Sequence, residues 1–589
     1  MSIIETKLNG NIIMVDDLIS RGKKLIDSQQ NSVLSAASVI MIMVVLSRVL
    51  GLFRQRILAN YFDPGSLSLF FAAFRLPDII FEILVFGTFS SAFIPVFTKV
   101  LKTGEKHAWA LAGRVVSVGL VIFIIVATFF GLAANHIYSV ISPGFTDVET
   151  AQIATIARIL FAAQGFFVVS YVLTGVLESL RRFLVPALAP IFYNLGIILG
   201  TIVLSPKMGL MGPAIGVVIG AFAHFLIQYP LSRKLGFRFN WGLKADDDLK
   251  KIGQLALPRV IDLSFDQVGK TVELFLASVI SKASYTYFTF ANTLQLLPVT
   301  LFGTSLAKAV LPILSSQADN KKEFRRILLT AMFQAIFFTL PVAAALIVLR
   351  VPVIRLIYGT KIFDWTATIQ TGVVLSFFAV GVVSQTLMAI LTRSFFALHD
   401  TKTPVIISFI GLGLLIAGDF ILVKIFGFPV WALAASFTFS TLVEAIILLI
   451  LINKRIGRIL NGDFALRFIK IMVGVLASSS VMYFMLKIFD RSVWVKRLSF
   501  LSSLEATHDF PFQNFVLDTR YTGNLIVLTG ATFLIGILIY LLVTFILQVP
   551  EVYYFLNLIK KAILKRQFPK IPAKEDEPIA PTTTDTQAQ

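Results

Sequence analysis

The chain has 589 residues, of which 57% are hydrophobic and only 14% are charged, and its mean hydropathy is +0.84. This composition excludes a set of soluble domains and is typical of an all-α polytopic membrane protein. The sequence contains no cysteine, which excludes disulfides and cysteine-ligated metals, and its net charge of +19 has to be explained by where the basic residues lie.

Apolar runs of about 20 residues predict about fourteen transmembrane helices. We expect no cleavable signal peptide, because the first run begins near Val33 after a polar stretch with basic residues. The first span starts near Ser32, and the others cover residues 67–100, 111–135, 151–178, 185–205, 210–231, 252–281, 285–316, 325–349, 366–396, 404–424, 428–452, 466–488 and 522–547.

Basic residues gather in alternate loops between these spans, which by the positive-inside rule predicts that both termini are cytoplasmic. Much of the +19 charge then reflects topology and contact with anionic lipid, so we expect membrane lipids, and no nucleic acid, as partners. The basic loops hold Lys99, Lys102, Lys106 and Arg114; Arg181 and Arg182; Arg233, Lys234, Arg238 and Lys244; Lys321, Lys322, Arg325 and Arg326; and Lys454, Arg455 and Arg458.

An internal repeat divides the chain. Leu173-Thr174 with Pro186 recurs as Leu391-Thr392 with Pro404, at an offset of 218, and the Phe-Gly-Thr at 86–88 recurs at 302–304, at an offset of 216. Each unit holds six spans, so the copies run parallel about an axis normal to the membrane, as in alternating-access transporters. The expected parts are an N-terminal cytoplasmic segment (1–31), an N-lobe with helices 1–6 (32–235), a C-lobe with helices 7–12 (248–455), helices 13–14 (464–548), and a cytoplasmic tail (549–589) with a disordered end.

The first span carries two candidate substrate-binding arginines, Arg48 and Arg54, on either side of Gly51. A glycine can bend a helix inside the membrane, and guanidinium groups suit bidentate contacts with phosphate. The alternative is that Arg54 and Arg56 extend to the outer membrane surface, which we favour for Arg56.

Arg75, Asp78 and Glu82 share an arc of about 60° on helix 2. They predict a cavity wall opposite helix 7, in which Arg75 binds substrate and the two acids gate the path. The alternative is a set of salt bridges, local between Arg75 and Asp78 or between the lobes, that locks one state.

Helix 7 bears five ionisable residues within an arc of about 80°, and such a stripe cannot face lipid. We predict that Arg259 and Lys270 bind substrate and that Asp262, Asp266 and Glu273 line or gate a cavity. Self-neutralisation by pairs at i,i+3 and i,i+4 spacing remains open. Against it, Asp262 and Asp266 are like charges one turn apart, which calls for a cation or a proton between them.

Isolated acids in apolar spans are the candidates for ion coupling. Asp419 lies in helix 11 and Glu444 in helix 12, and with Asp262 they offer the oxygen ligands that hard cations prefer. Coupling to Na⁺ and coupling to H⁺ are equally compatible with these residues. We expect no resident cofactor and no enzyme activity, because there is no P-loop and the five histidines are scattered. The stretch from Asp400 to Pro404 is interpreted as a capped helix start.

Several short segments together carry a family resemblance. They are SRVLGLFR at 47–54, FFAAFRLP at 70–77, SSAFIP at 90–95, SPGF at 142–145, RFLVPALAP at 182–190 with Asn194, and RSFFALHDTKTP at 393–404. Taken together, they resemble the lipid II flippase family MurJ (also called MviN) of the MOP exporter superfamily. The resemblance implies fourteen helices in two lobes, a final pair forming a hydrophobic groove, and export of a polyprenyl-diphosphate-linked peptidoglycan precursor. It also implies a sodium site among helices 7, 11 and 12, near Asp419.

The chain departs from the family pattern at the residues implied to hold the diphosphate. Arg48 and Arg54 match helix 1, but Gln55 replaces an acidic residue, and the arginines of helices 2 and 8 are Phe81 and Thr293. The departures indicate either a modified substrate or a clamp rebuilt from other cations. The candidates for such a clamp are Arg75, Arg259, Lys270 and Lys308.

We therefore predict a flippase for lipid II in the bacterial inner membrane, with the lipid-linked glycan as substrate. The resemblance leaves contacts with other cell-wall synthesis proteins open. The alternatives are an exporter of another lipid-linked oligosaccharide or of drugs, a membrane glycosyltransferase using the loop between helices 13 and 14, and a non-transporting scaffold. The two-lobe repeat would be unexplained in an enzyme.

Overall fold

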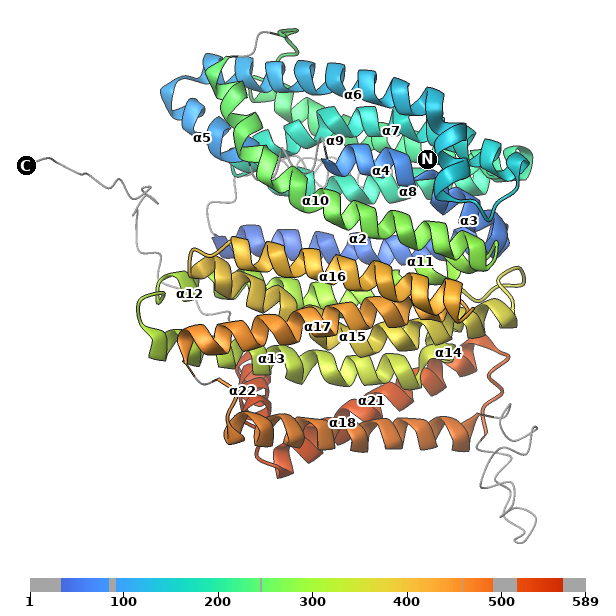
Figure 1. The fold of residues 1–589 in the computed structure, drawn as a ribbon, viewed down its shortest axis with the longest axis vertical. Helices are drawn as coiled ribbons and strands as arrows, with labels where there is room; N and C mark the ends of the chain where they lie inside the picture. The colour runs from blue at the N-terminus through green and yellow to red at the C-terminus, as the bar shows by residue number, and fades with distance from the viewer. Residues whose placement is uncertain (1–32, 84–91, 244–245, 458, 491–515, 565–589) are drawn as a thin grey trace, which may run out of the picture.

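The computed structural model describes residues 33–83, 92–243, 246–457, 459–490 and 516–564. Within these ranges every named element is a helix, as the composition predicts, and Figure 1 shows the helices stacked in layers. The expected disordered end of the tail and most of the loop between helices 13 and 14 lie outside the described residues.

The first lobe contains helices 1–6 of the sequence analysis. In helix 2, α3 and α4 meet at Phe74, whose backbone is itself helical, so Pro64–Phe81 forms one candidate span. The elements are α2 (Val33–Tyr61), α3 (Pro64–Ala73), α4 (Arg75–Phe81), α5 (Ile94–Thr103), α6 (Glu105–Ile141), α7 (Asp147–Ser179), α8 (Leu184–Met208) and α9 (Met211–Lys234).

The second lobe contains helices 7–12. Helices 8 and 11 each include a short π-helical stretch, a feature often found at functional sites. The elements are α10 (Asp247–Ile280), α11 (Ser284–Pro298), η3 (Val299–Thr304), α12 (Ser305–Ser315), α13 (Lys321–Val348), α14 (Arg350–Ile357), α15 (Trp365–Ala397), α16 (Lys402–Phe420), η4 (Ile421–Ile425) and α17 (Trp431–Ile456).

The last helices form a third layer against the C-lobe. These are α18 (Gly462–Phe489), α21 (Thr522–Ile546) and α22 (Pro550–Leu564), and α18 and α21 pack on α13 around Phe333, Phe337 and Tyr540. Glu551 of α22 pairs with Arg467 of α18, which attaches the final helix to this layer.

Twelve helices in the described part of the chain are long and apolar enough to cross a membrane. The two remaining long helices are α2, with 29 residues, and α10, with 34. The α10 helix carries the five-residue charged stripe and therefore has no apolar window of sufficient length. A multi-pass architecture is confirmed, whereas the exact number of fourteen spans stays a prediction.

Glycines allow the closest helix contact of the N-lobe. A Cβ added at Gly196 or Gly200 of α8 would collide with the backbone of α9 at Gly216 and Gly220. Small residues at such a crossing let two membrane helices approach to backbone contact. The α8–α9 pair is therefore a rigid wall behind α2, which packs on α8.

The two lobes meet at the end of the bundle where α2 ends and α3 begins. The hydroxyl oxygens of Ser68 and Thr286 lie 2.9 Å apart, and Thr360 donates to the carbonyl of Ala59 over 2.8 Å. These contacts join α3 of the first lobe to α11 of the second, and the end of α2 to the segment after α14.

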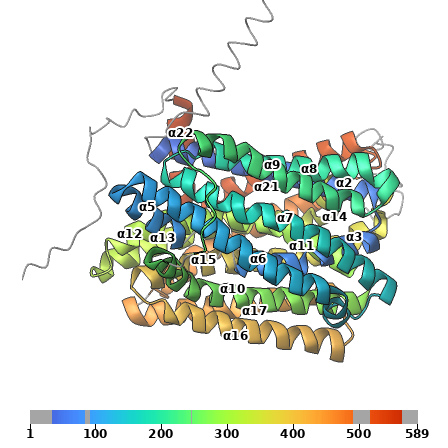
Figure 2. The ribbon, with the colours of Figure 1, turned by 90° about the horizontal axis from the view of Figure 1, so that it is seen from above.

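Helix α10 contacts both lobes and lies between α6 and α16 (Figures 1 and 2). Its N-cap Asp246 is 2.5 Å from Arg114 of α6, and its neighbour Asp248 is 3.1 Å from His107. On the other side, Phe265 packs against Phe409 of α16 with ring centroids 5.4 Å apart. This placement makes α10 the helix through which movement of one lobe reaches the other.

Candidate functional site

The two helix 1 arginines lie on α2, which continues as one helix through Gly51, and that glycine faces the side chain of Asn194. A bend at Gly51 stays a prediction. Arg48 is exposed and makes no hydrogen bond or ion pair within the described residues. Arg54 Nη1 donates to Asn194 Oδ1 over 3.0 Å, and its Nε is buried without a partner. Among the described residues neither guanidinium forms an ion pair with a carboxylate, so both remain available to bind an anion.

Both arginines line a cavity of about 560 Å³ between α2, α7, α8 and the middle of α11. This size is suited to a small-molecule headgroup. The wall opposite the arginines includes Tyr171, Tyr193 and Thr174. The sequence-predicted pair Arg48 and Arg54 is therefore brought together in one open cavity.

A second cavity of about 400 Å³ adjoins the first, and both are lined by Tyr171, Tyr193 and His224. It extends toward Asp78 and Gln164. Gln164 is only 5% exposed, and its Oε1 has no hydrogen-bond partner. This part of the site thus presents two carboxylates, Asp78 and Glu82, and the amide of Gln164, whereas the first part presents two arginines and one carboxylate, Glu178.

The charged residues of helices 2 and 7 form a seam between α4 and α10. Arg75 donates to the Gln267 side chain and, over 3.3 Å, to its carbonyl, and Gln267 Nε2 in turn donates to Glu82. Lys270 Nζ lies 3.4 Å from Glu82 and 2.5 Å from Asp266. The predicted approach of helix 2 to helix 7 exists, and Gln267, which the charge pattern did not single out, is at its centre.

Asp78 departs from the expected arrangement. It does not face α10 with its neighbours, because its Oδ1 accepts a hydrogen bond from Gln164 Nε2 of α7 over 3.0 Å. No ion pair joins it to Arg75 among the described side chains. Asp78 thus lies toward the N-lobe cavity, whereas Arg75 and Glu82 reach α10.

Two positions that depart from the family pattern contact each other. Gln55 Nε2 donates to Thr293 Oγ1 over 3.1 Å, and Tyr358 donates to Gln55 Oε1 over 2.8 Å. A neutral amide and a neutral hydroxyl therefore occupy a place where the resemblance implies an acid and an arginine. The third departure, Phe81, packs edge-on to Tyr171 with ring centroids 5.2 Å apart.

Other cations of the predicted site lie elsewhere. Arg56 donates to the carbonyls of Leu356 and Ile357 at the end of α14, over 2.6 and 3.3 Å, which is a structural role. Lys308 is exposed on α12 and lines neither N-lobe cavity. Arg259 and Asp262 belong to α10, but their side chains lie outside the described residues.

The candidate coupling acids lie in the C-lobe. Asp419 has no exposed surface, and both of its oxygens lack a hydrogen-bond partner. It interacts electrostatically with Glu273 of α10 and lies close to Ser436 of α17. Glu444 is also buried, packs against Gly411 of α16, and accepts from Ser440 over 3.3 Å.

Asp419 and Glu444 are not parts of one cluster. Their serine neighbours, Ser436 and Ser440, donate to the carbonyls of Leu415 and Gly411 over 2.9 and 2.7 Å. Since Ser436 and Glu444 are eight residues apart on α17, the two acids lie at depths that differ by about 12 Å. They are separate candidates for ion binding rather than joint ligands.

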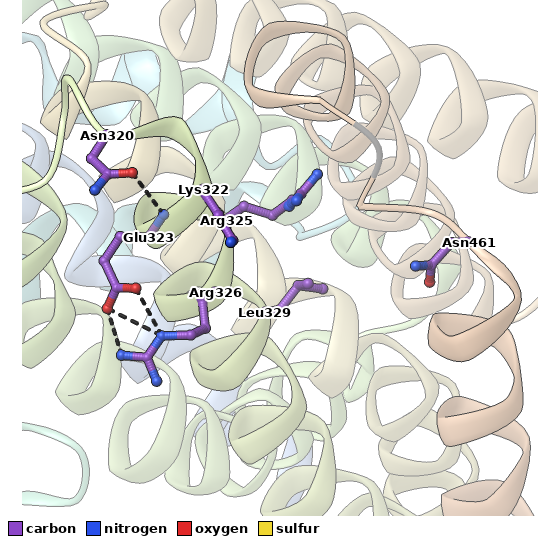
Figure 3. A pocket seen from close by; sticks show the side chains of 7 residues that line it. All are labelled: Asn320, Lys322, Glu323, Arg325, Arg326, Leu329 and Asn461. Atoms are coloured by element: carbon purple, nitrogen blue, oxygen red, sulfur yellow. Dashed lines mark hydrogen bonds and ion pairs between the residues drawn. The ribbon is translucent and has the colours of Figure 1, made fainter.

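A third cavity, of about 710 Å³, opens at the ends of α13 and α18 and is lined by charged residues (Figure 3). Arg326 binds both oxygens of Glu323, at 3.1 and 2.9 Å from its Nε, whereas Lys322 and Arg325 have no carboxylate partner in the same cavity. These residues belong to a loop that the sequence predicts to be cytoplasmic. We interpret this cavity as a basic contact with anionic lipid rather than as the substrate site.

The model of the family described as "Lipid II flippase MurJ" matches this chain from residue 58 to residue 504. The chain belongs to the MurJ family. Membership confirms the resemblance and places the chain among membrane transporters, so the glycosyltransferase alternative is wrong.

Named relatives agree with this assignment. A probable lipid II flippase MurJ of Vibrio cholerae is 28% identical over 389 residues, which cover 63% of this chain and 74% of that protein. The lipid II flippase MurJ of Burkholderia cenocepacia is 26% identical over 375 residues, covering 61% and 72%.

Solved structures share the fold. A lipid II flippase MurJ in an inward closed conformation superposes with a TM-score of 0.69 at 23% identity, over 88% of this chain and 99% of that one. An inward-facing multidrug resistance MATE transporter of the MOP superfamily reaches 0.59 at 16% identity, over 71% and 98%. The MurJ-like helix arrangement is thus confirmed independently of the sequence motifs.

Charge-based reasoning missed the neutral members of the site. Asn194, Gln164 and Gln267 are amides in predicted spans, and each makes the decisive contact to a charged residue. The signal that could have found them is the amide itself, since a buried amide in a membrane helix needs partners. Tyr193 carried no comparable signal, because aromatic residues are common in every span of this chain.

Proposed function

We propose that this chain flips lipid II, a polyprenyl-diphosphate-linked peptidoglycan precursor, across the inner membrane by alternating access between its two lobes. One observation supports this most directly: Arg48 and Arg54 line a cavity of about 560 Å³, and neither forms an ion pair among the described residues, although Glu178 lines the same cavity. Guanidinium groups bind phosphate oxygens through charge-assisted hydrogen bonds. The diphosphate would bind there while the polyprenyl tail stays in lipid.

A second candidate substrate is another polyprenyl-diphosphate-linked glycan. The observation that favours it is the neutral Gln55–Thr293 contact, together with Phe81, which makes the cavity less cationic than the family pattern implies. Both substrates share the diphosphate, so Arg48 and Arg54 would serve either one.

We also propose that transport is coupled to a cation at Asp419, with Na⁺ and H⁺ as the two candidates. A buried carboxyl without a basic partner is costly inside a membrane and is stabilised by binding a cation. Asp419 fits this requirement because both of its oxygens lack hydrogen-bond donors. Glu444, which packs tightly against Gly411, is the second candidate. The cytoplasmic orientation of both termini and contacts with other cell-wall synthesis proteins belong to the same proposal.

Rescue of a flippase-depleted bacterium tests the proposal, with the sidedness of lipid II measured directly. The intact chain should restore growth and move lipid II to the outer leaflet. The Arg48→Ala, Arg54→Ala double variant should be inserted but inactive, and Lys308→Ala is the matched control. Restored growth without lipid II export would assign another substrate, and full activity of a stable double variant would refute the binding site.

A further inference from the structure

The N-lobe cavity has two chemically different ends that meet at an aromatic wall. One end is lined by the cations Arg48 and Arg54 and by Glu178, and the other by Asp78, Glu82 and Gln164, with no cation among its lining residues. Tyr193 is one of the few residues that line both cavities. A single elongated ligand that fills both would therefore be anionic at one end and rich in hydrogen-bond donors at the other.

The aromatic wall is rigid. Phe167 holds Tyr193 edge-on, with ring centroids 5.2 Å apart, and Tyr171 stacks on His224 at 5.9 Å with 21° between the planes. Behind the wall, Ser170 hydrogen-bonds His224 Nδ1 over 2.6 Å and also accepts from Gln228 Nε2 over 2.7 Å. Because these polar contacts fix His224, the tyrosine faces are already in place before a ligand arrives.

The acceptor end has unused capacity. Gln164 uses its Nε2 to donate to Asp78, so its Oε1 is oriented by that contact, and yet this oxygen is buried with no donor. A buried acceptor without a partner is unfavourable, and a ligand hydroxyl or amide N–H that reached it would remove this cost. The Oε1 atom itself has almost no accessible surface, so a ligand reaches it only when the side chain turns, whereas Asp78, which lines the same cavity, is only partly buried.

We propose that the Tyr171, Tyr193, Asp78 and Gln164 end of the cavity is a glycan subsite, which binds the sugar attached to the diphosphate held by Arg48 and Arg54. Sugars combine apolar ring faces, which pack on aromatic side chains, with hydroxyl and amide donors, which suit Gln164 Oε1 and Asp78. This proposal rests on the proposed function, since it assumes a polyprenyl-diphosphate-linked substrate. It adds that the N-lobe distinguishes the glycan-bearing lipid from the bare diphosphate.

Binding of two lipids to the purified full chain in nanodiscs tests the proposal, with undecaprenyl diphosphate and lipid II as probes. In Tyr193→Leu the affinity for lipid II should fall roughly 2- to 12-fold, while that for undecaprenyl diphosphate stays unchanged. Tyr193→Phe keeps the ring and should bind both lipids as the parent does. Phe192→Leu makes the same kind of change at the adjacent, exposed ring and is the matched control.

The outcomes separate the subsite from the proposed function. Equal weakening of both lipids in Tyr193→Leu, or no weakening of either, would overturn the subsite, whereas failure of the parent chain to bind either lipid would overturn the proposed function itself. Arg54→Ala should weaken both lipids. Tyr171→Leu provides a second variant with the same expectation, should Tyr193→Leu not fold.

Discussion

The two lobes bury polar side chains in different ways. In the N-lobe, Arg48, Arg54 and Gln164 border cavities of about 560 and 400 Å³. In the C-lobe, Asp419 and Glu444 lie in helix–helix contacts, against Ser436 and Gly411. The difference indicates that the lobes have different roles, because a headgroup needs an open cavity, whereas a proton needs only a buried carboxyl and a small cation a compact set of buried oxygen ligands.

The α10 helix connects these two environments. Its Gln267 and Lys270 contact Glu82 of the N-lobe. Its Glu273 interacts electrostatically with Asp419 of the C-lobe. Cation binding near Asp419 can therefore influence the N-lobe through one continuous helix. A ligand shifts such an equilibrium only if its affinity differs between the two states.

Arg54→Ala should produce the largest loss among the single variants. It removes a charge-assisted contact worth about 1.5–3 kcal/mol, which corresponds to a decrease in transport of roughly 10- to 150-fold. Asn194→Ala, which removes only the neutral partner of Arg54, should have a smaller effect of about 5-fold. Lipid II flipping in proteoliposomes measures both. Equal activity of Arg54→Ala and the parent chain would assign the N-lobe cavity to another ligand.

Asp419→Asn should abolish the dependence of transport on its coupling cation, with a loss of roughly 10-fold at saturating cation. The amide keeps the size of the side chain but cannot neutralise a cation. Flipping rates measured against Na⁺ concentration and, separately, against a pH gradient identify the ion. Glu444→Gln is the comparison variant in the second helix contact. If Asp419→Asn keeps the cation dependence and Glu444→Gln loses it, the coupling site is at Glu444 and not at Asp419.

How far the sequence predicts this site depends on the kind of residue. The charged stripe of helix 7 and the helix 1 arginines were recognisable because ionisable groups cannot face lipid. Helix periodicity shows which residues share a face but not which neighbouring helix each of them meets, so the contact of Asp78 with Gln164 was unpredictable. Nor does it show that Gln55 and Thr293, on helices 1 and 8, contact each other.

Glu82→Gln should loosen the seam between α4 and α10. The change removes the carboxylate that both Gln267 and Lys270 contact. The interaction between α4 and α10 should weaken by about 1 kcal/mol, a small value because Lys270 is partly exposed to solvent. Reaction of a single cysteine placed at Leu263, which lines the smaller cavity, with a water-soluble thiol reagent should become faster. The native chain has no cysteine, so the parent protein with the same cysteine is a clean control. Unchanged reactivity would show that the seam does not restrain α10.

The smallest effect is expected at Asp400, before α16. Burial alone would raise the pKa of this carboxyl, but hydrogen bonds from the Thr403 N–H and hydroxyl and the contact with Arg455 together lower the pKa below its ordinary value. A carboxyl with a lowered pKa in the folded state stabilises the protein above its unfolded pKa of about 3.9, and this stabilisation is lost as the pH falls through the folded value.

Asp400→Ala should accordingly lower the free energy of unfolding by roughly 1 kcal/mol at neutral pH and by progressively less as the pH falls below about 4. Thermal unfolding in detergent across that pH range measures the difference. A constant difference between the two proteins at all pH values would show that Asp400 does not act through its charge.

The most direct test of the central claim is flipping of fluorescent lipid II by the purified chain in proteoliposomes, compared with its Arg48→Ala, Arg54→Ala variant at equal incorporation. We predict flipping by the parent chain and a rate at the level of empty liposomes for the variant, because no other cation lining this cavity replaces the two guanidinium groups. Flipping by the folded double variant at the parent rate would contradict the account, since the diphosphate would then bind elsewhere.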